Sequence, residues 1–271
     1  MTGSDPALRI VVDERPPPAG GVTRILVTND DGIDSPGLRH LAVALNETFQ
    51  VVVAAPASDM SGSGTAIGRF DADYGVDLRR ADFDGVKAYA VLGPPGLAVT
   101  AAALGAFGSP PDIVVSGVNA GINTGHSVIH SGTVGAVLTA RTFSRRGLAV
   151  SLAQSEPWHW DTAVAVAIGA TQWLIGHPRH RTVLNVNVPG LALADVRGIR
   201  WADLDDFGHF RVATADVERQ RLQFEVTGST AGLGPARDTT LCAEGYVTIT
   251  MLSGIEPEPF PDEPAAAVWS P

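Results

Sequence analysis

Short apolar runs alternate with longer amphipathic stretches over most of the chain. Runs that are apolar almost throughout predict buried strands at residues 24–28, 50–55, 112–116, 148–152 and 182–188, and an alternating run predicts another at 87–92. Apolar residues at helical spacing predict one helix that begins at Ser35-Pro36, and further helices over residues 95–107, 131–145 and 160–175. Strands that alternate with helices predict a Rossmann-like, doubly wound α/β fold with three layers and a mostly parallel sheet.

The rhythm changes after Gly190. Residues 209–214, 222–227 and 246–252 read as strands with no helices between them, which predicts a β-hairpin arm at about residues 201–245. We expect one α/β domain over residues 23–252. A Pro-rich, flexible extension should precede it at residues 1–22, with an edge strand at 9–12, and a Pro-rich tail should follow it at 253–271. Residues 70–83 read as irregular.

Two adjacent carboxylates, Asp30 and Asp31, stand where the first predicted strand ends. Such a pair repels itself unless a proton or a cation lies between its members. Hard divalent cations prefer oxygen ligands, so Mg²⁺, Mn²⁺ or Ca²⁺ is the natural occupant. The alternative for Asp31-Gly32 alone is an ordinary turn with a capping carboxylate.

Other oxygen-bearing side chains follow neighbouring strands. Ser61 lies in the loop after the second strand, and Asn119 follows the strand at 112–116. Ligands of open α/β sheets bind beyond the carboxyl ends of the strands, so these loops should meet Asp30 and Asp31 at one edge. Each residue alone also fits an ordinary loop position.

Small residues precede the helix at 131–145. Ser131, Gly132 and Thr133 would leave backbone N–H groups free to face an anion, and the helix dipole would add an attraction of about 0.3–1 kcal/mol. A plain Ser N-cap is the simpler interpretation. A phosphate beside a cation held by carboxylates makes more chemical sense than either feature alone.

Composition narrows the class of protein. The chain has 271 residues, 45% of them hydrophobic, and its net charge of −10 offers no basic surface for a nucleic-acid duplex or an anionic membrane. One cysteine, Cys242, excludes an internal disulfide and fits a reducing cytoplasm. No apolar run is long enough to span a bilayer.

Several motifs together resemble one known family. TNDDGIDSPG, the segment at 55–62, PDIVVSGVNAGINTG, SGTVGA, NVNVP and GYVTIT occur in the order typical of the SurE family of metal-dependent 5′/3′-nucleotidases, and they cover about residues 24–252. The resemblance implies a divalent metal held by Asp30, Asp31, Ser61 and Asn119. It further implies contacts to phosphate from residues near Asn119 and Asn123 and from the segment Ser131, Gly132 and Thr133. The expected assembly is a homodimer or homotetramer that exchanges its arm between subunits.

The chain departs from this family at its periphery. A Gly-Thr-Pro-x-Asp-Cys segment is replaced by GPPGLA at 93–98, a Tyr by His130 and a Glu by Thr139, and the aromatic arm motif is not recognisable between 207 and 234. The predicted metal shell is intact. Substrate selection is therefore expected to differ more than the reaction.

We interpret the chain as a cytoplasmic phosphomonoesterase that uses a divalent metal as Lewis acid on a small phosphorylated substrate. The substrate class is nucleoside monophosphates, polyphosphate or another phosphomonoester. Asp30 could be a metal ligand or could attack phosphorus itself. His126 and His130 are candidates for protonating the leaving group, although each also fits a solvent-facing loop position.

Two other interpretations stay open. A phospho-receiver domain also carries an acidic pair after its first strand, but Lys87 precedes its strand instead of following it. A catalytically silent nucleotide-binding or assembly protein would explain the departures.

Overall fold

The computed structural model describes residues 23–69, 75–206, 211–218, 221–227 and 234–254. Its main sheet has nine strands in the order β3-β4-β2-β1-β5-β6-β7-β11-β8. These are β1 (Arg24–Thr28), β2 (Gln50–Pro56), β3 (Leu78–Ala81), β4 (Lys87–Val91), β5 (Ile113–Ala120), β6 (Arg146–Leu152), β7 (Val183–Val188), β8 (Ile199–Trp201) and β11 (Val247–Leu252). Neighbouring strands from β4 to β7 run parallel, whereas β3 and β11 are antiparallel to β4 and β7.

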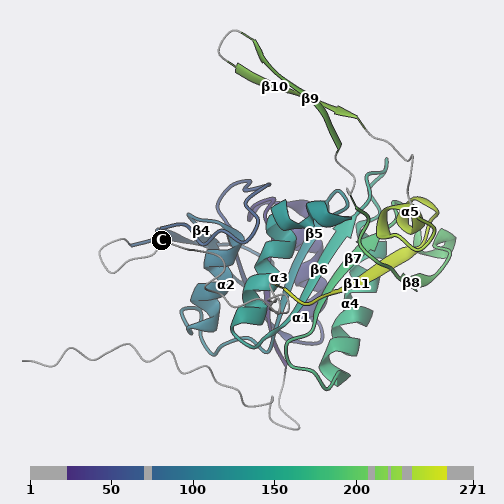
Figure 1. Cartoon of the computed structure of the whole chain (residues 1–271). Helices are drawn as coiled ribbons and strands as arrows, with labels where there is room; N and C mark the ends of the chain where they lie inside the picture. Colours follow the sequence, from purple (N-terminus) through teal and green to yellow (C-terminus); the bar gives the residue numbers. More distant parts are fainter. Residues whose placement is uncertain (1–22, 70–74, 207–210, 219–220, 228–233, 255–271) are drawn as a thin grey trace, which may run out of the picture.

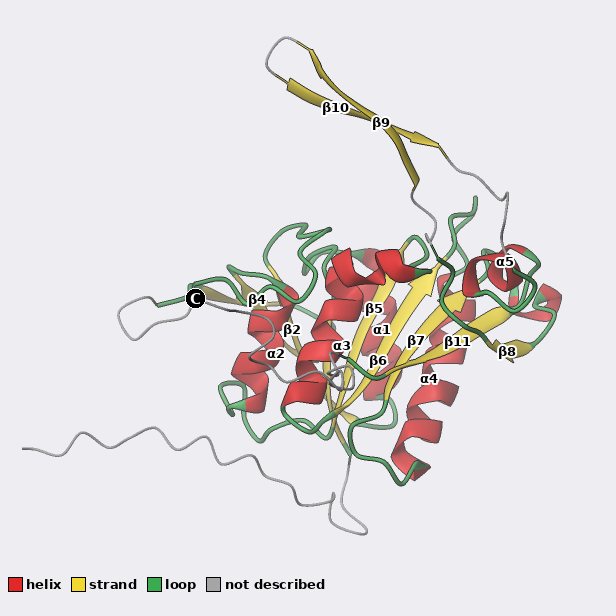
Figure 2. Ribbon diagram, in the orientation of Figure 1, coloured by secondary structure: helices red, strands yellow, loops and turns green. Residues whose placement is uncertain are grey.

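Helices cover both faces of this sheet (Figure 2). One apolar cluster packs α1 (Pro36–Asn46) and α4 (Trp160–Gly176) on one face, and a second cluster packs α2 (Pro95–Ala103) and α3 (Gly132–Thr142) on the other. The central strands are buried on both sides, which explains why their sequences are apolar runs instead of alternating ones. The predicted three-layer, doubly wound α/β fold is confirmed.

Local sequence signals set the start of the first helix beside the site. The Ser35 side chain accepts a hydrogen bond from Leu38 N, and Pro36 occupies the first turn of α1, where its missing N–H costs nothing. Leu38, Leu41 and Leu45 recur at helical spacing and are fully buried. Burying a leucine side chain contributes about 1.5–3 kcal/mol, so this face fixes α1 on the sheet.

Some short elements differ from the prediction. β3 lies within the stretch expected to be irregular, β8 forms the open edge beyond β11, and α5 (Asp238–Ala243) interrupts the region expected to hold only strands. Two 3-10 turns, η1 (His126–His130) and η2 (Leu193–Asp195), complete the described elements. All are too short for a periodic apolar pattern, so their conformation depends on tertiary contacts.

The predicted arm is a two-stranded antiparallel hairpin of β9 (Arg211–Glu218) and β10 (Arg221–Thr227). It stands away from the body of the molecule (Figure 1). The predicted extension at 1–22, its edge strand at 9–12 and most of the tail at 253–271 lie outside the described residues. None of the helices within the described ranges is long and apolar enough to cross a membrane.

Gly135 marks a close approach between α3 and the loop after β2. A Cβ added at Gly135 would lie 1.9 Å from the carbonyl oxygen of Gly64, whereas one added at Gly169 on α4 would meet nothing within 4 Å. We expect Gly135→Ala to lower the free energy of unfolding by about 1–3 kcal/mol, as overpacking does. Gly169→Ala should raise it by about 0.5–1 kcal/mol, because alanine loses less backbone entropy in a helix. Urea unfolding of both variants measures the difference, and equal effects would contradict the close contact.

Candidate active site

The two predicted carboxylates lie at the carboxyl end of β1, as expected, but in different environments. Asp30 is 3% exposed and faces the first turn of α3, while Asp31 is half-buried beside the end of β5, where Ala120 N donates to its Oδ2 at 3.3 Å. Burial raises the pKa of Asp30, against the lowering effect of hydrogen bonds from Thr133 and Gly132. Burial and then the charge of Asp30 raise the pKa of Asp31 to about 6.

Asn119 joins this pair through one hydroxyl group. The Thr133 side chain donates a short hydrogen bond to Asp30 Oδ1, and its Oγ1 lies 3.3 Å from Asn119 Oδ1. The Asn119 amide nitrogen is turned away and donates to Gly121 O at 2.8 Å, which leaves its oxygen facing the carboxylate. The loop after β1 and the carboxyl end of β5 therefore bring oxygen atoms of Asp30 and Asn119 together at the Thr133 hydroxyl.

Gly132 is required for this convergence. A Cβ added there would lie 2.7 Å from Asp30 Cβ and 2.6 Å from Ser63 Oγ. Both distances are too short for any side chain at this position, so the first turn of α3 can approach Asp30 only with glycine. Ser131 caps the same helix by accepting from Val134 N at 3.1 Å. The plain N-cap interpretation of Ser131 therefore holds alongside the predicted anion site.

Ser61 lies at the same edge but does not contact the carboxylate pair directly. Met60 N donates to Asp30 O at 2.7 Å, which ties its loop to β1. The exposed Ser61 hydroxyl donates to Asp59 Oδ1 at 2.6 Å. The Asp59 charge also contributes to raising the pKa of Asp31, so a third carboxylate approaches the pair. Asp59 is not among the predicted ligands, although an acidic residue two positions before Ser61 is visible in the sequence.

The backbone and side chain of Asn123 form hydrogen bonds with residues of β6 and β7. Its side-chain amide donates to Ser151 Oγ at 2.8 Å, its backbone N–H donates to Asn187 Oδ1 at 2.7 Å, and its carbonyl accepts from Asn185 and Asn187, both at 2.9 Å. The contact between Asn123 and phosphate stays a prediction. The structure adds a role for the two asparagines of the NVNVP motif, which anchor the loop after β5. Polar residues inside the buried strand β7 were the available signal.

The two loop histidines are exposed and lie on η1. The carbonyl of His130 accepts from Gly64 N at 3.1 Å, so its backbone is fixed to the loop after β2 while its ring faces solvent. Solvent-facing rings fit the simpler interpretation of His126 and His130. We refer to these two exposed histidines of η1 as the rim, and contact of either ring with a leaving group stays a prediction.

Two of the segments that depart from the family pattern face each other. Thr139 Oγ1 donates to Gly135 O at 2.8 Å, and a methyl group added at Gly96 would lie 3.2 Å from that hydroxyl. Small groups on α2 and α3 thus meet where these two segments pack together. The two departures therefore lie next to each other where α2 packs on α3, and neither Gly96 nor Thr139 contacts the carboxylate pair in the described hydrogen bonds.

The donor set suits a hard divalent cation. Two carboxylates sit side by side where burial disfavours their charge, and the neutral oxygens of Asn119 and Ser61 lie at the same edge. Asp59 does not complete a site of three carboxylates: within the described ranges, no three His, Cys, Asp or Glu side chains are placed to hold one metal ion. Any cation here would depend on neutral oxygens as well, which Mg²⁺ and Mn²⁺ accept.

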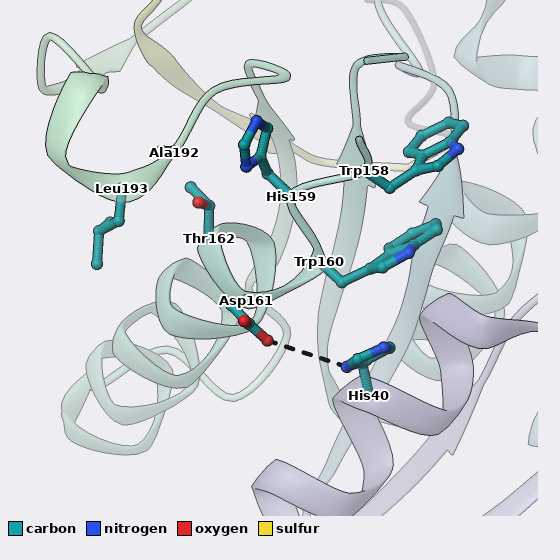
Figure 3. Close-up of a pocket in the computed structure, with 8 residues that line it drawn as sticks. All are labelled: His40, Trp158, His159, Trp160, Asp161, Thr162, Ala192 and Leu193. Carbon is teal, nitrogen blue, oxygen red and sulfur yellow. Dashed lines mark ion pairs between the residues drawn. The ribbon is translucent and has the colours of Figure 1, made fainter. Parts of the chain in front are cut away.

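Two cavities of the described structure lie outside this cluster. One, of about 370 Å³, lies between α1 and α4 and is lined by His40, the stacked Trp158 and Trp160, and Leu193 among others (Figure 3). The other, of about 520 Å³, is an apolar groove between α4 and the β8 edge. Neither is lined by Asp30, Asp31 or Asn119, so the carboxylate pair does not open into them.

Comparison with known proteins identifies the family of the chain. The family described as survival protein SurE matches residues 25–208. The 5′-nucleotidase SurE of Alkalilimnicola ehrlichii is 37% identical over 232 residues, which cover 84% of this chain and 88% of that protein. The 5′/3′-nucleotidase SurE of Salmonella arizonae is 37% identical over 233 residues, which cover 84% and 89%. The crystal structure of the SurE protein from Aquifex aeolicus matches with a TM-score of 0.72 and 26% identity, over 84% of this chain and 92% of that one. The resemblance seen in the motifs is thereby confirmed, and the chain belongs to the SurE family.

Proposed function

We propose that this protein is a metal-dependent phosphomonoesterase that hydrolyses nucleoside monophosphates. The observation that carries the proposal is the convergence of Asp30 and Asn119 on Thr133, at the first turn of α3. The relatives named as nucleotidases support the same reaction class. A silent binding protein of the same fold is the alternative, and release of phosphate from a nucleotide panel separates the two.

The chain's own residues would divide the work. Asp30, Asp31, Asn119 and Ser61 would hold Mg²⁺ or Mn²⁺, which when bound supplies Lewis-acid chemistry at a phosphoryl oxygen. The backbone N–H groups at the start of α3 would orient the phosphate. Thr133, which the family resemblance assigns to phosphate, holds Asp30 in place in this structure. His126 and His130 stand at the rim, where one of them would return a proton to the departing alcohol.

The first test removes one charge at a time. Asp30→Asn and Asp31→Asn should each lower kcat/KM with saturating Mn²⁺ by about a hundredfold or more, because losing even an outer-shell partner of a metal costs 10–100-fold. Both variants should stay folded, because burial already disfavours both charges. In Asp30→Asn the side-chain oxygen would still accept the Thr133 hydroxyl, but only one acceptor oxygen would remain for the N–H groups at the start of α3, so its melting temperature should fall slightly more than that of Asp31→Asn.

Asp34→Asn serves as the matched control, since Asp34 lies exposed in the same loop. It should keep wild-type turnover, and a chelator should abolish turnover in the wild type and the control alike. Near-normal activity of either Asp30→Asn or Asp31→Asn under saturating metal would remove both the ligand and the nucleophile roles proposed for that residue.

We further propose that the chain assembles as a homodimer or a higher homo-oligomer. The sheet ends in an open edge at β8, where Trp201 is 59% and Ile199 55% exposed. Trp201 packs edge-on against Trp173 of α4 with ring centroids 5.9 Å apart, at the apolar groove. Exposed apolar edges are usually paired or covered. The hairpin of β9 and β10 also needs a packing partner, because an isolated two-stranded hairpin is only marginally stable in water. A second copy is the occupant that would cover both.

Trp201→Glu should therefore shift the protein toward monomer in light scattering, because it places a charge in a surface that a partner would desolvate. Leu104→Glu is the matched control: Leu104 is 48% exposed at the end of α2, away from this edge, and its replacement should leave the mass unchanged. A wild type that is monomeric and fully active at assay concentration would remove the proposal.

Substrate choice should depend on the rim. The start of α3 would recognise the phosphate that all phosphomonoesters share, so discrimination must come from groups such as His130, which stands where the family usually has Tyr. Stacking of an aromatic ring on a base is worth about 1–3 kcal/mol. We expect modest preference among nucleotides in the wild type, and His130→Tyr should raise kcat/KM for a nucleotide relative to p-nitrophenyl phosphate by about fivefold or more.

His126→Tyr makes the same exchange at the other exposed histidine of η1 and should change this ratio less. If the wild type already prefers one nucleotide far above the aryl phosphate, the rim recognises the base by other groups and the prediction is wrong.

A further inference from the structure

Asp238 is a fully buried carboxylate at the start of α5, and the hydrogen bonds that it accepts come mainly from backbone N–H groups. Its Oδ2 accepts from Gly125 N at 2.9 Å, and its Oδ1 accepts from Asp205 N at 3.0 Å and from Thr239 N at 2.8 Å. The first two donors lie 113 and 33 residues away in the sequence. Its position as the first residue of α5 explains only the contact with Thr239.

The distant donors belong to two functional parts of the chain. Gly125 immediately precedes η1, which leads directly into Ser131 and the first turn of α3. Asp205 lies between β8 and β9, at the root of the arm. His126 N also donates to Asp205 O at 2.9 Å, so a second hydrogen bond joins the same two segments. Asp238 therefore lies where the loop of the candidate active site meets the base of the arm.

The two segments at the base of the arm, residues 203–206 and 234–238, which we call the arm root, are hydrogen-bonded to each other. Asp203 N donates to Ala236 O at 3.1 Å, and Asp238 N donates to Asp203 O at 2.9 Å, so the outgoing and returning segments pair. Arg237 adds a hydrogen bond to Leu204 O at 2.6 Å. These hydrogen bonds hold the Asp238 carboxylate in place, so it can anchor the loop between β5 and α3.

The loop between β5 and α3 is thus anchored twice. Asn123 is tied to β6 and β7 by the asparagine network, and Gly125 and His126 are tied to the arm root. Hydrogen bonds from N–H groups to a buried carboxylate are among the stronger ones in proteins. Losing one anchor would free η1 to move relative to α3, while Asp30 and Asp31, on another loop, would stay in place.

We propose that Asp238 is a positioning residue for the substrate: it holds η1 and the approach to Ser131 in the geometry that binds the phosphomonoester. The inference rests on the proposed function for its kinetic consequence. It predicts a separation of effects, because a displaced η1 weakens substrate binding but leaves the carboxylate pair intact. KM should rise while kcat changes little.

Asp238→Asn in the full-length chain is the direct test. An asparagine offers one carbonyl oxygen and an NH₂ group that cannot accept, so at least one backbone donor loses its partner. We expect KM to rise about five- to tenfold, with kcat within about twofold of wild type, as for one lost hydrogen bond to a charged group. Amide exchange at Gly125 and His126 should accelerate more than at Asn119.

Asp112→Asn is the matched control. Asp112 also accepts a backbone N–H, from Arg24 at 2.8 Å, but it lies at the amino end of β5, opposite the site. It should lower stability without changing KM or the exchange at Gly125. An unchanged KM and unchanged Gly125 exchange in Asp238→Asn would overturn the proposal, whatever its loss of stability.

Arg237→Met keeps the proposal testable if Asp238→Asn does not fold. Arg237 is partly exposed and its loss loosens the arm root without touching the buried carboxylate. KM should rise by about twofold, in the same direction, and no change would count against the inference. A wild type without phosphatase activity would instead refute the proposed function, and the exchange measurements would still decide whether Asp238 holds η1.

Discussion

The buried contact between Asp30 and the first turn of α3 is the constraint on which the site depends. A carboxylate that is 3% exposed carries an unfavourable desolvation energy, which the Thr133 hydroxyl and the N–H groups of the helix start offset only in part. The geometry needs a residue without a side chain at Gly132, and the loop after β2 must lie against Gly135. Three loops are therefore held together around a charge that the interior disfavours, which is an arrangement that favours a cation.

Much of this could be predicted from the sequence, because the signals were local. The apolar runs of β1, β2, β5, β6 and β7 and the spacing of Leu38, Leu41 and Leu45 in α1 reflect burial of the same residues in the structure. The placement of Asp30, Asp31 and Asn119 at one edge followed from parallel strands, whose carboxyl ends meet on the same side. The ends of the elements were less accurate: β5 continues to Ala120 and α2 stops at Ala103.

The remaining features depend on contacts between residues that are far apart in the sequence. Asn123 meets Asn187 across 64 residues and Asp238 meets Gly125 across 113. A polar residue in a buried strand or a short helix indicates that a hydrogen-bond partner is present, but the sequence does not identify that partner. The sequence offered no sign that Asn123 is bound to the interior, and Asp238 did not stand out at all. The short elements β3, β8 and α5 follow the same logic, since neighbours stabilise them and their own sequences do not.

The two kinds of contact support different parts of the candidate site. Asp30, Asp31 and Asn119 at the strand ends and Thr133 at the start of α3 form an inner cluster that the sheet holds in place. These residues keep the motifs of the family. The rim consists of His126 and His130 on η1, and it is held through different bonds: the Asn123 network, the Gly64–His130 hydrogen bond and the Asp238 carboxylate. Because these bonds use mostly backbone atoms of the rim, its side chains can change without disturbing their own support. This explains how His130 can replace Tyr at the rim while Asp30, Asp31, Ser61 and Asn119 are retained.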